Sequence, residues 1–172
     1  MAENESPVFL VDAYSDPVIL RIRGRASFLN CAPVRDFFDR VSEMGKRSVV
    51  IDFEGCTGMD STFLGIMAGA ALEFRKMDPP GDFTLVRLSQ RNLELVRNLG
   101  LHRILNVESG DFDMNFAAQS AESLDGISQS EKENARMVLQ AHESLVEADE
   151  SNQKKFQDVL SFLRLQVDKD SA

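Results

Sequence analysis

The chain has 172 residues, of which 43% are hydrophobic and 12 are phenylalanine, so it can fill the core of one compact domain and is not a disordered protein. Its formal net charge of −9 at pH 7 argues against a nucleic-acid or anionic-membrane partner, because both require clustered Lys and Arg. No apolar run approaches the roughly 20 residues of a membrane-spanning helix, and the acidic start lacks the basic and apolar regions of a signal peptide.

The first half of the chain alternates between strand and helix patterns. Residues 8–12 are apolar and predict a strand, and the alternation of apolar residues with arginine over 18–25 predicts a second strand partly facing water. Residues 33–44 repeat apolar side chains at helical spacing, with Gly45 ending the helix. The β-branched run 48–53 predicts a central strand covered on both faces, and 62–76 returns to a helical period.

The pattern continues to residue 110. A turn at 78–82 leads to a strand over 83–88, a helix over 89–100 with Ser89 as N-cap and Gly100 near its end, and a last strand over 103–107. Strands that alternate with helices indicate parallel pairing, whereas the short link between the first two strands indicates an antiparallel pair. The predicted fold class is therefore α/β, a small mixed sheet with helices packed on it, formed by a domain over 1–110.

The last third of the chain has a different composition. Residues 111–127 are small and polar and predict a linker, and residues 128–168 predict a helical extension that begins at a capping box of Ser130 and Glu133. Apolar residues keep one heptad phase through this extension, which favours one long interrupted helix or two helices in register. Two interpretations stay open: the extension lies on the body of the domain, or it forms a coiled-coil seam for a homodimer or another partner.

The junction after the central strand contains Asp60, Ser61 and Thr62, where a buried strand gives way to a helix. Loops at this end of such strands commonly carry function. Asp, Ser and Thr are preferred N-cap residues, so capping alone is one interpretation. The other is that a serine hydroxyl at the domain surface accepts a phosphoryl group, because Asp60 is already an adequate cap.

The same residues carry a family resemblance. The segment 8–108 resembles a STAS domain, the fold of bacterial anti-sigma factor antagonists, both in its order of strands and helices and in the sequence VVIDFEGCTGMDSTFLGIMAGA. The family usually shows a hydrophobic strand, then Asp-Ser-Ser or Asp-Ser-Thr, then Gly-Leu-Gly and a helix of small residues. About three-fifths of the chain is covered by the resemblance.

The resemblance implies a function and partners. In the family, an anti-sigma factor that is also a serine kinase phosphorylates the serine after the Asp, and a metal-dependent serine phosphatase removes the phosphate. The unmodified antagonist binds the kinase. Carried onto this chain, the phosphoacceptor is Ser61, with Thr62 as second choice.

The chain departs from the family at two places beside this serine. Phe63 replaces the usual glycine, and Gly24-Arg25-Ala26-Ser27 replaces Gly-Glu-Leu-Asp, so that a basic residue stands where an acidic one is usual. Two interpretations of Phe63 stay open: it joins the core, or it reshapes the docking surface around Ser61. The expected partner-binding surface consists of Asp60, Ser61, Thr62, Phe63, Arg25 and Ser27.

No enzyme site is indicated. His102 and His142 lie far apart without ligands at metal spacing, His142 being interpreted as a polar residue of the heptad seam. Cys31 and Cys56 are interpreted as reduced thiols of a cytoplasmic protein, and we expect no cofactor and no metal. The alternative function is a non-catalytic scaffold that self-associates through its C-terminal helix, with Ser61 only a helix cap.

Overall fold

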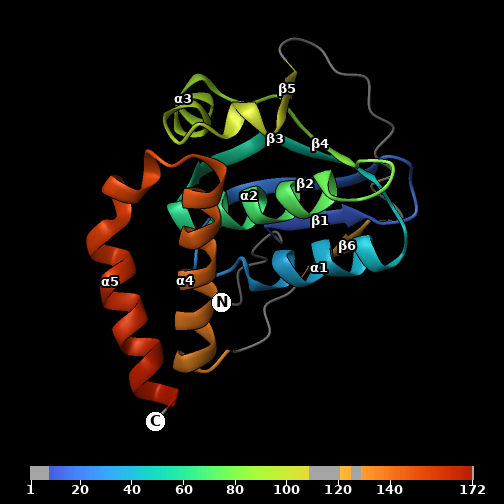
Figure 1. The fold of residues 1–172 in the computed structure, drawn as a ribbon. Helices are drawn as coiled ribbons and strands as arrows, with labels where there is room; N and C mark the ends of the chain where they lie inside the picture. Colours follow the sequence, from blue (N-terminus) through green and yellow to red (C-terminus); the bar gives the residue numbers. More distant parts are fainter. Residues whose placement is uncertain (1–7, 109–120, 125–128, 172) are drawn as a thin grey trace, which may run out of the picture.

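The computed structural model describes residues 8–108, 121–124 and 129–171 (Figure 1). Six strands form one mixed sheet in the order β5-β4-β3-β2-β1-β6. Strands β2 to β5 pair in parallel, whereas β1 pairs antiparallel with β2 and with β6, so the predicted mixed sheet is confirmed. The strands are β1 (Phe9–Asp12), β2 (Val18–Ala26), β3 (Ser48–Met59), β4 (Asp82–Val86), β5 (Asn106–Glu108) and β6 (Glu122–Ser123).

Some helices pack directly on this sheet, and others pack on those helices. Helices α1 and α2 lie on one face of the sheet, and α4 and α5 form further layers outside α2 (Figure 1). Helix α3 begins at Ser89 as predicted, with the Ser89 hydroxyl accepting a hydrogen bond from the Asn92 N–H at 3.1 Å. The helices are α1 (Ala32–Glu43), α2 (Ser61–Arg75), α3 (Gln90–Asn98), the 3-10 turn η1 (Leu101–Arg103), α4 (Glu131–Ala148) and α5 (Asn152–Ser171).

The core lies between the sheet and helices α1 and α2. Alternate residues of β3, such as Ile51 and Phe53, point into it because successive strand side chains face opposite sides of a sheet. The Phe83 ring meets the rings of Phe38 and Phe74 edge-on, with centroids 5.1 and 4.8 Å apart. Such pairs contribute about 0.5–1.5 kcal/mol each beyond their buried area.

Strand β3 is longer than the sequence predicts, since it runs to Met59 rather than ending at residue 53. The extra residues include Gly55 and Gly58, which weaken strand propensity, and backbone pairing with β2 holds them in the sheet. Two register shifts between β2 and β3, each with one extra residue on β3, accommodate this pairing. As a result, β3 leads without a loop into Asp60 and α2. The last strand also differs, because η1 occupies the start of the segment predicted as strand.

The C-terminal extension consists of two helices that fold back on each other, with the turn at Asp149–Ser151. The heptad phase in the sequence reflects this pairing, because Leu160 and Leu163 of α5 are buried where it packs on α4. We call α4 and α5 together the hairpin. The predicted linker lies mostly outside the described residues, and its described part contributes β6. In the described part of the chain no helix is long and apolar enough to cross a membrane.

Candidate functional site

The site begins at Asp60, which caps α2. Its Oδ1 accepts a hydrogen bond from the Phe63 N–H at 2.9 Å, and its Oδ2 accepts one from the Phe28 N–H at 2.8 Å. The carboxylate therefore joins the first turn of α2 to the turn that follows β2. Capping of this kind stabilises a helix by about 1 kcal/mol. Asp60, rather than Ser61, is the helix cap.

Ser61 occupies the first position of α2 and its side chain is partly buried. Its Oγ lies 2.8 Å from the Nε2 of His142, a residue of α4. His142 is only 3% exposed, and its ring meets the Phe156 ring of α5 edge-on at a centroid distance of 5.0 Å. The hydroxyl is thus paired with a buried imidazole contributed by the C-terminal hairpin.

The second ring nitrogen fixes the direction of this hydrogen bond. His142 Nδ1 lies 2.7 Å from the carbonyl oxygen of Val138, which can only accept a hydrogen bond. In the neutral imidazole the proton therefore sits on Nδ1, and Nε2 is the acceptor. Consequently, the Ser61 hydroxyl donates its proton to His142 Nε2.

Three members of the expected partner-binding surface are buried. Thr62 is 4% exposed, Ser27 is 7% exposed, and Phe63 is fully buried with its ring 5.9 Å from that of Phe9. The prediction that they lie on the surface is wrong, because Thr62 and Phe63 begin the inward face of α2. Arg25 is exposed, and Asp60 and Ser61 are partly exposed, so only these three remain accessible.

Helix α4 approaches α2 closely at two glycines. A Cβ placed on Gly65 would lie 2.2 Å from the backbone oxygen of Ala141, and one placed on Gly69 would lie 2.9 Å from the Ser144 Oγ. A side chain at Gly65 would therefore collide with the α4 backbone. The small-residue face of α2, which reads GIMAGA in the sequence, contacts α4 through Gly65 and Gly69, and we call this face the seat of α4.

The turn of the hairpin is attached to the end of α3. Asn152 is fully buried, and its Nδ2 donates hydrogen bonds to the backbone oxygens of Leu99 at 2.9 Å and Leu145 at 2.7 Å. Lys155 bonds to the backbone oxygen of Asn98. Buried polar groups with such partners hold a turn in one position.

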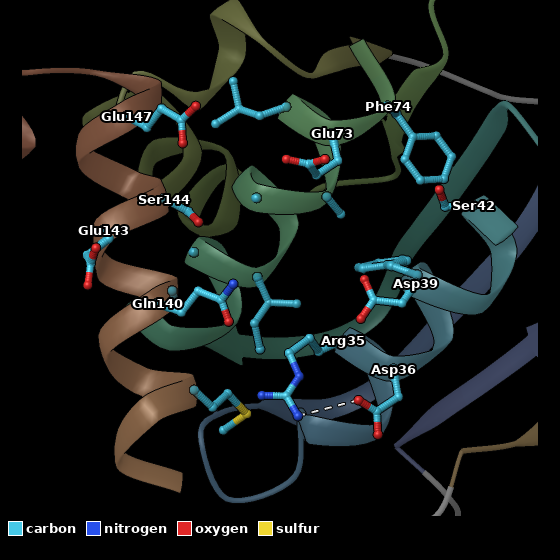
Figure 2. A pocket seen from close by; sticks show the side chains of 18 of the residues that line it. Arg35, Asp36, Asp39, Ser42, Glu73, Phe74, Gln140, Glu143, Ser144 and Glu147 are labelled. Atoms are coloured by element: carbon cyan, nitrogen blue, oxygen red, sulfur yellow. Dashed lines mark hydrogen bonds and ion pairs between the residues drawn. The ribbon is translucent and has the colours of Figure 1, made fainter. Parts of the chain in front are cut away.

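An acidic groove of about 720 Å³ runs between α1, α2 and α4 beside this seat (Figure 2). Burial raises the pKa of Asp39, and the neighbouring carboxylates of Asp36, Glu43 and Glu73 raise it further, against the opposing effect of Arg35. The hairpin presents more negative charge to the same groove. The acidic residues that line it are Asp36, Asp39, Glu43, Glu73, Glu143 and Glu147.

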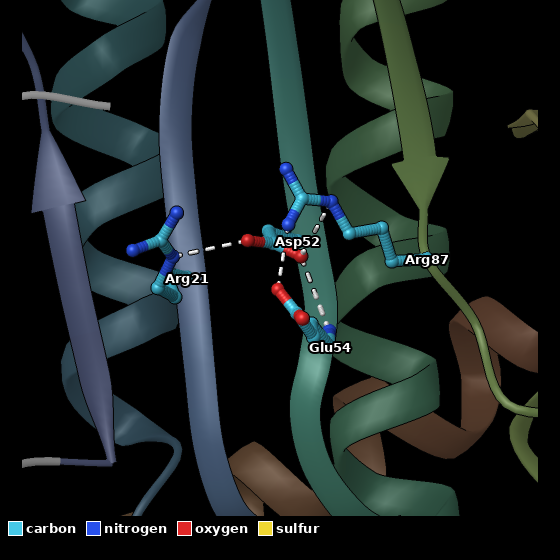
Figure 3. A network of polar contacts seen from close by, with 4 residues as sticks. All are labelled: Arg21, Asp52, Glu54 and Arg87. Atoms are coloured by element: carbon cyan, nitrogen blue, oxygen red, sulfur yellow. Dashed lines mark hydrogen bonds and ion pairs between the residues drawn. The ribbon is translucent and has the colours of Figure 1, made fainter. Parts of the chain in front are cut away.

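A separate polar cluster occupies the opposite face of the sheet (Figure 3). Asp52 accepts a hydrogen bond from the Glu54 N–H at 3.1 Å. It also pairs with Arg21 at 3.0 Å and lies 3.9 Å from Arg87, which in turn pairs with Glu54 at 2.6 Å. Because Asp52 is fully buried, these partners offset the cost of burying its charge.

Neither the histidines nor the cysteines assemble a further centre. His102 is exposed on η1, and burial raises the pKa of both thiols, that of Cys31 to about 12. Within the described ranges, no group of three or more His, Cys, Asp or Glu side chains could hold a metal ion. Sequence reasoning missed the role of His142, which lies 81 positions from Ser61, and the small-residue face of α2 is the signal that pointed to a closely packed partner helix.

The fold and this site define a small α/β domain with a hydroxyl at the junction of its central strand and a capped helix. The model of the STAS domain family matches residues 9–115, and the chain belongs to this family. No curated protein sequence matches the chain.

The chain is similar to solved structures, one of which reaches a TM-score of 0.50 and shows the same fold. The anti-sigma factor antagonist SpoIIAA in its unphosphorylated form is similar with a TM-score of 0.50 and 18% identity, over 60% of this chain and 89% of SpoIIAA. The Bacillus cell fate determinant SpoIIAA in the phosphorylated form gives a TM-score of 0.49 and 18% identity, over 59% of this chain and 91% of that one.

Proposed function

We propose that the chain is a phosphorylation-switched protein-binding module, an anti-sigma factor antagonist that binds an anti-sigma factor with serine kinase activity when Ser61 is unphosphorylated. The kinase modifies Ser61, with Thr62 as second choice, and a metal-dependent serine phosphatase restores the hydroxyl. The chain itself is not an enzyme, takes no cofactor and acts in the cytoplasm. Membership of the STAS family and the likeness of the fold to an anti-sigma factor antagonist support this proposal.

The position of the Ser61 hydroxyl is the observation that carries the proposal. It stands at the end of β3 and the first turn of α2, and it is partly exposed, whereas the neighbouring Thr62 hydroxyl is buried. A phosphate there adds about −1.5 to −2 charges at pH 7. The N-terminus of α2 favours that charge and the Asp60 carboxylate opposes it. The modification therefore changes the local charge of a surface without entering the core.

Phosphosite mapping by mass spectrometry, on the chain purified from its native cells, tests the acceptor directly. We expect phosphate on Ser61. The matched control is Thr62→Val, which removes the buried hydroxyl but keeps the side-chain shape, and it should be phosphorylated as the unchanged chain is. Phosphate found on Thr62 alone would reassign the acceptor.

Binding to the purified anti-sigma kinase tests the switch. Ser61→Ala should bind and resist phosphorylation, whereas a chain with phosphoserine installed at position 61 should bind at least about tenfold more weakly, a difference of about 1.4 kcal/mol. Equal affinity of the modified and unmodified chains for that kinase would contradict a phosphorylation switch.

A second candidate function is a self-associating scaffold, favoured by the outer face of α5. Val159, Phe162 and Leu165 are 41%, 66% and 72% exposed and recur every three residues along one side of the helix. Exposed apolar side chains that gather on one face commonly mark an interaction surface.

Sedimentation equilibrium of Phe162→Gln/Leu165→Gln tests the scaffold. If the scaffold exists, the unchanged chain is a dimer or larger and this variant is a monomer. The matched control, Ser161→Gln/Arg164→Gln, changes neighbouring exposed positions of the same helix and should keep the assembly. A monomeric unchanged chain at micromolar concentration would exclude this function.

A further inference from the structure

The C-terminal hairpin covers the surface that the proposed function requires. Helix α4 crosses the first half of α2, where Ser61, Gly65 and Gly69 meet His142, Ala141 and Ser144 in turn (Figure 1). We propose that the hairpin is a cover that is closed over Ser61 and the α2 face in the unmodified chain, where a partner must displace it, and that phosphorylation of Ser61 releases it. The weaker partner binding of the modified chain then comes from the charge of the phosphate itself and not from the hairpin. The identity of Ser61 as phosphoacceptor rests on the proposed function, whereas the closed contact itself does not.

The hydrogen bond between the hairpin and Ser61 depends on the hydroxyl proton. In the neutral imidazole, His142 Nδ1 donates to the Val138 carbonyl, and Nε2 then has only a lone pair to offer. Phosphorylation breaks the Ser61 Oγ–H bond and forms an Oγ–P bond with the γ-phosphoryl group of ATP, while ADP leaves and the proton passes to solvent. The ester oxygen has no proton to donate. The contact at 2.8 Å then sets two lone pairs against each other.

The surroundings of Ser61 leave the new phosphate no favourable place under the closed hairpin. The imidazole above it is buried against Phe156. Beside it, Asp60 is held in place by two backbone N–H groups and cannot turn away without giving up both bonds. Because Ser61 is only partly exposed, a dianion there is incompletely hydrated while it lies beside a fixed carboxylate and beneath a buried ring. Opening of the hairpin restores that water.

The seat of α4 leaves no space for a phosphate between the two helices. At Gly65, one helical turn after Ser61, the backbones are so close that even one methyl group does not fit, so a phosphate is admitted only if α4 moves away from α2. The acidic groove has carboxylates on both sides, such as Glu73 on α2 and Glu143 on α4, and the ion pair across it, Lys76 with Glu147 at 3.9 Å, is between exposed side chains and contributes little to closure. The hairpin is therefore expected to leave as one unit, together with the His142 contact.

Hydrogen–deuterium exchange on the full chain tests the release without any partner. With phosphoserine installed at position 61, amides of residues 131–148 should exchange at least about tenfold faster than in the unmodified chain, while those of β3 remain equally protected. Equal or slower exchange of α4 in the modified chain would overturn the proposal, including the case in which a protonated His142 binds the phosphate and tightens the hairpin.

A reversible cross-link gives a second, quantitative measurement. A Cβ at Gly69 lies 3.5 Å from the Ser144 Cβ, at the short end of the range of about 3.5–4.5 Å found in disulfides. In the Gly69→Cys/Ser144→Cys chain, the equilibrium with glutathione measures the effective concentration of the two thiols. The native thiols, Cys31 and Cys56, are buried and do not compete.

Phosphoserine at position 61 should lower this effective concentration at least about tenfold. Ser61→Ala in the same double-cysteine chain is the matched control, since it removes the hydrogen bond to His142 without adding charge. It should lower the effective concentration of the two thiols less than phosphoserine does. An unchanged value with phosphoserine would overturn the release. Failure of the proposed function looks different: native cells would then yield no Ser61 phosphate, while the cross-link would still respond to phosphoserine.

Discussion

The body of the domain and the C-terminal hairpin are held together by different means. The body packs large side chains into one interior, as in the edge-on contacts of Phe83 with Phe38 and Phe74. The hairpin instead meets glycines of α2, adds Met137, Ala141 and Leu145 to the same apolar core, and is also held by polar contacts of His142 and Asn152. Separation of the hairpin from α2 therefore exposes these α4 side chains, while the ring contacts inside the body do not depend on it.

The largest expected effect tests the body. Phe63→Ala removes a fully buried ring that packs against Phe9, and it should lower the free energy of unfolding by about 3–5 kcal/mol, measured by urea denaturation. Leu160→Ala, at the contact of α5 with α4, is the comparison. It should speed exchange in the hairpin and leave the unfolding of the body nearly unchanged. Similar losses of body stability in both variants would show that the two regions unfold as one.

A smaller effect is expected at the seat. Gly65→Ala should weaken closure of the hairpin by about 1–3 kcal/mol, because its methyl group collides with the backbone of Ala141. The same change favours α2 itself by up to about 1 kcal/mol, since alanine is the better helix former. Exchange of α4 should therefore rise while α2 stays protected. Gly69→Ala, whose methyl meets the side chain of Ser144, is the milder control.

The turn of the hairpin should show an effect of similar or lesser size. Asn152→Ala leaves the buried carbonyls of Leu99 and Leu145 without this donor, a loss of about 1–3 kcal/mol in the local opening free energy. Exchange of amides around residues 149–155 measures it. Gln153→Ala, at the exposed neighbouring position, should change nothing, and an equal effect of both variants would argue against the role of Asn152.

The smallest effect concerns charge in the acidic groove. Because the pKa of Asp39 is raised in the folded chain, its ionisation opposes folding above that pKa, and the opposition disappears as pH falls below the ordinary carboxyl value of about 4. Asp39→Asn should therefore raise the thermal midpoint slightly at pH 7 and not at pH 3. A gain of equal size at both pH values would assign the effect to packing instead.

The sequence predicts the body well because its signals are local. Ser89 and Asp60 cap their helices as their residue types suggest, and alternation within β2 indicates its two faces. The end of β3 was not predictable, since Gly55 and Gly58 are poor strand residues that only pairing with β2 holds in place. Strand propensity therefore does not predict the end of a strand where pairing with a neighbouring strand extends it.

The site was only half predictable for a related reason. Asp60 and Ser61 are adjacent in the sequence, so their junction is visible there. His142 reaches Ser61 because α4 packs on the glycines of α2, a contact between distant parts of the chain. The heptad phase does not reveal it, since that phase is the same for a straight coiled coil and for a hairpin. The burial of Thr62 likewise depends on which face of α2 meets the sheet.

Strand β6 limits how far a released hairpin can travel. Its pairing with β1 holds Leu124 beside Phe9, where the Leu124 N–H donates to the Phe9 carbonyl at 3.0 Å. The chain from Leu124 to Ser130 spans at most about 20 Å even when fully extended. An opened hairpin thus stays at a local concentration on the order of millimolar and recloses unless a competitor takes its place. Any ligand for the α2 face must therefore compete with the attached hairpin. The ligand concentration that binding requires depends on the length of the connection between Leu124 and Ser130.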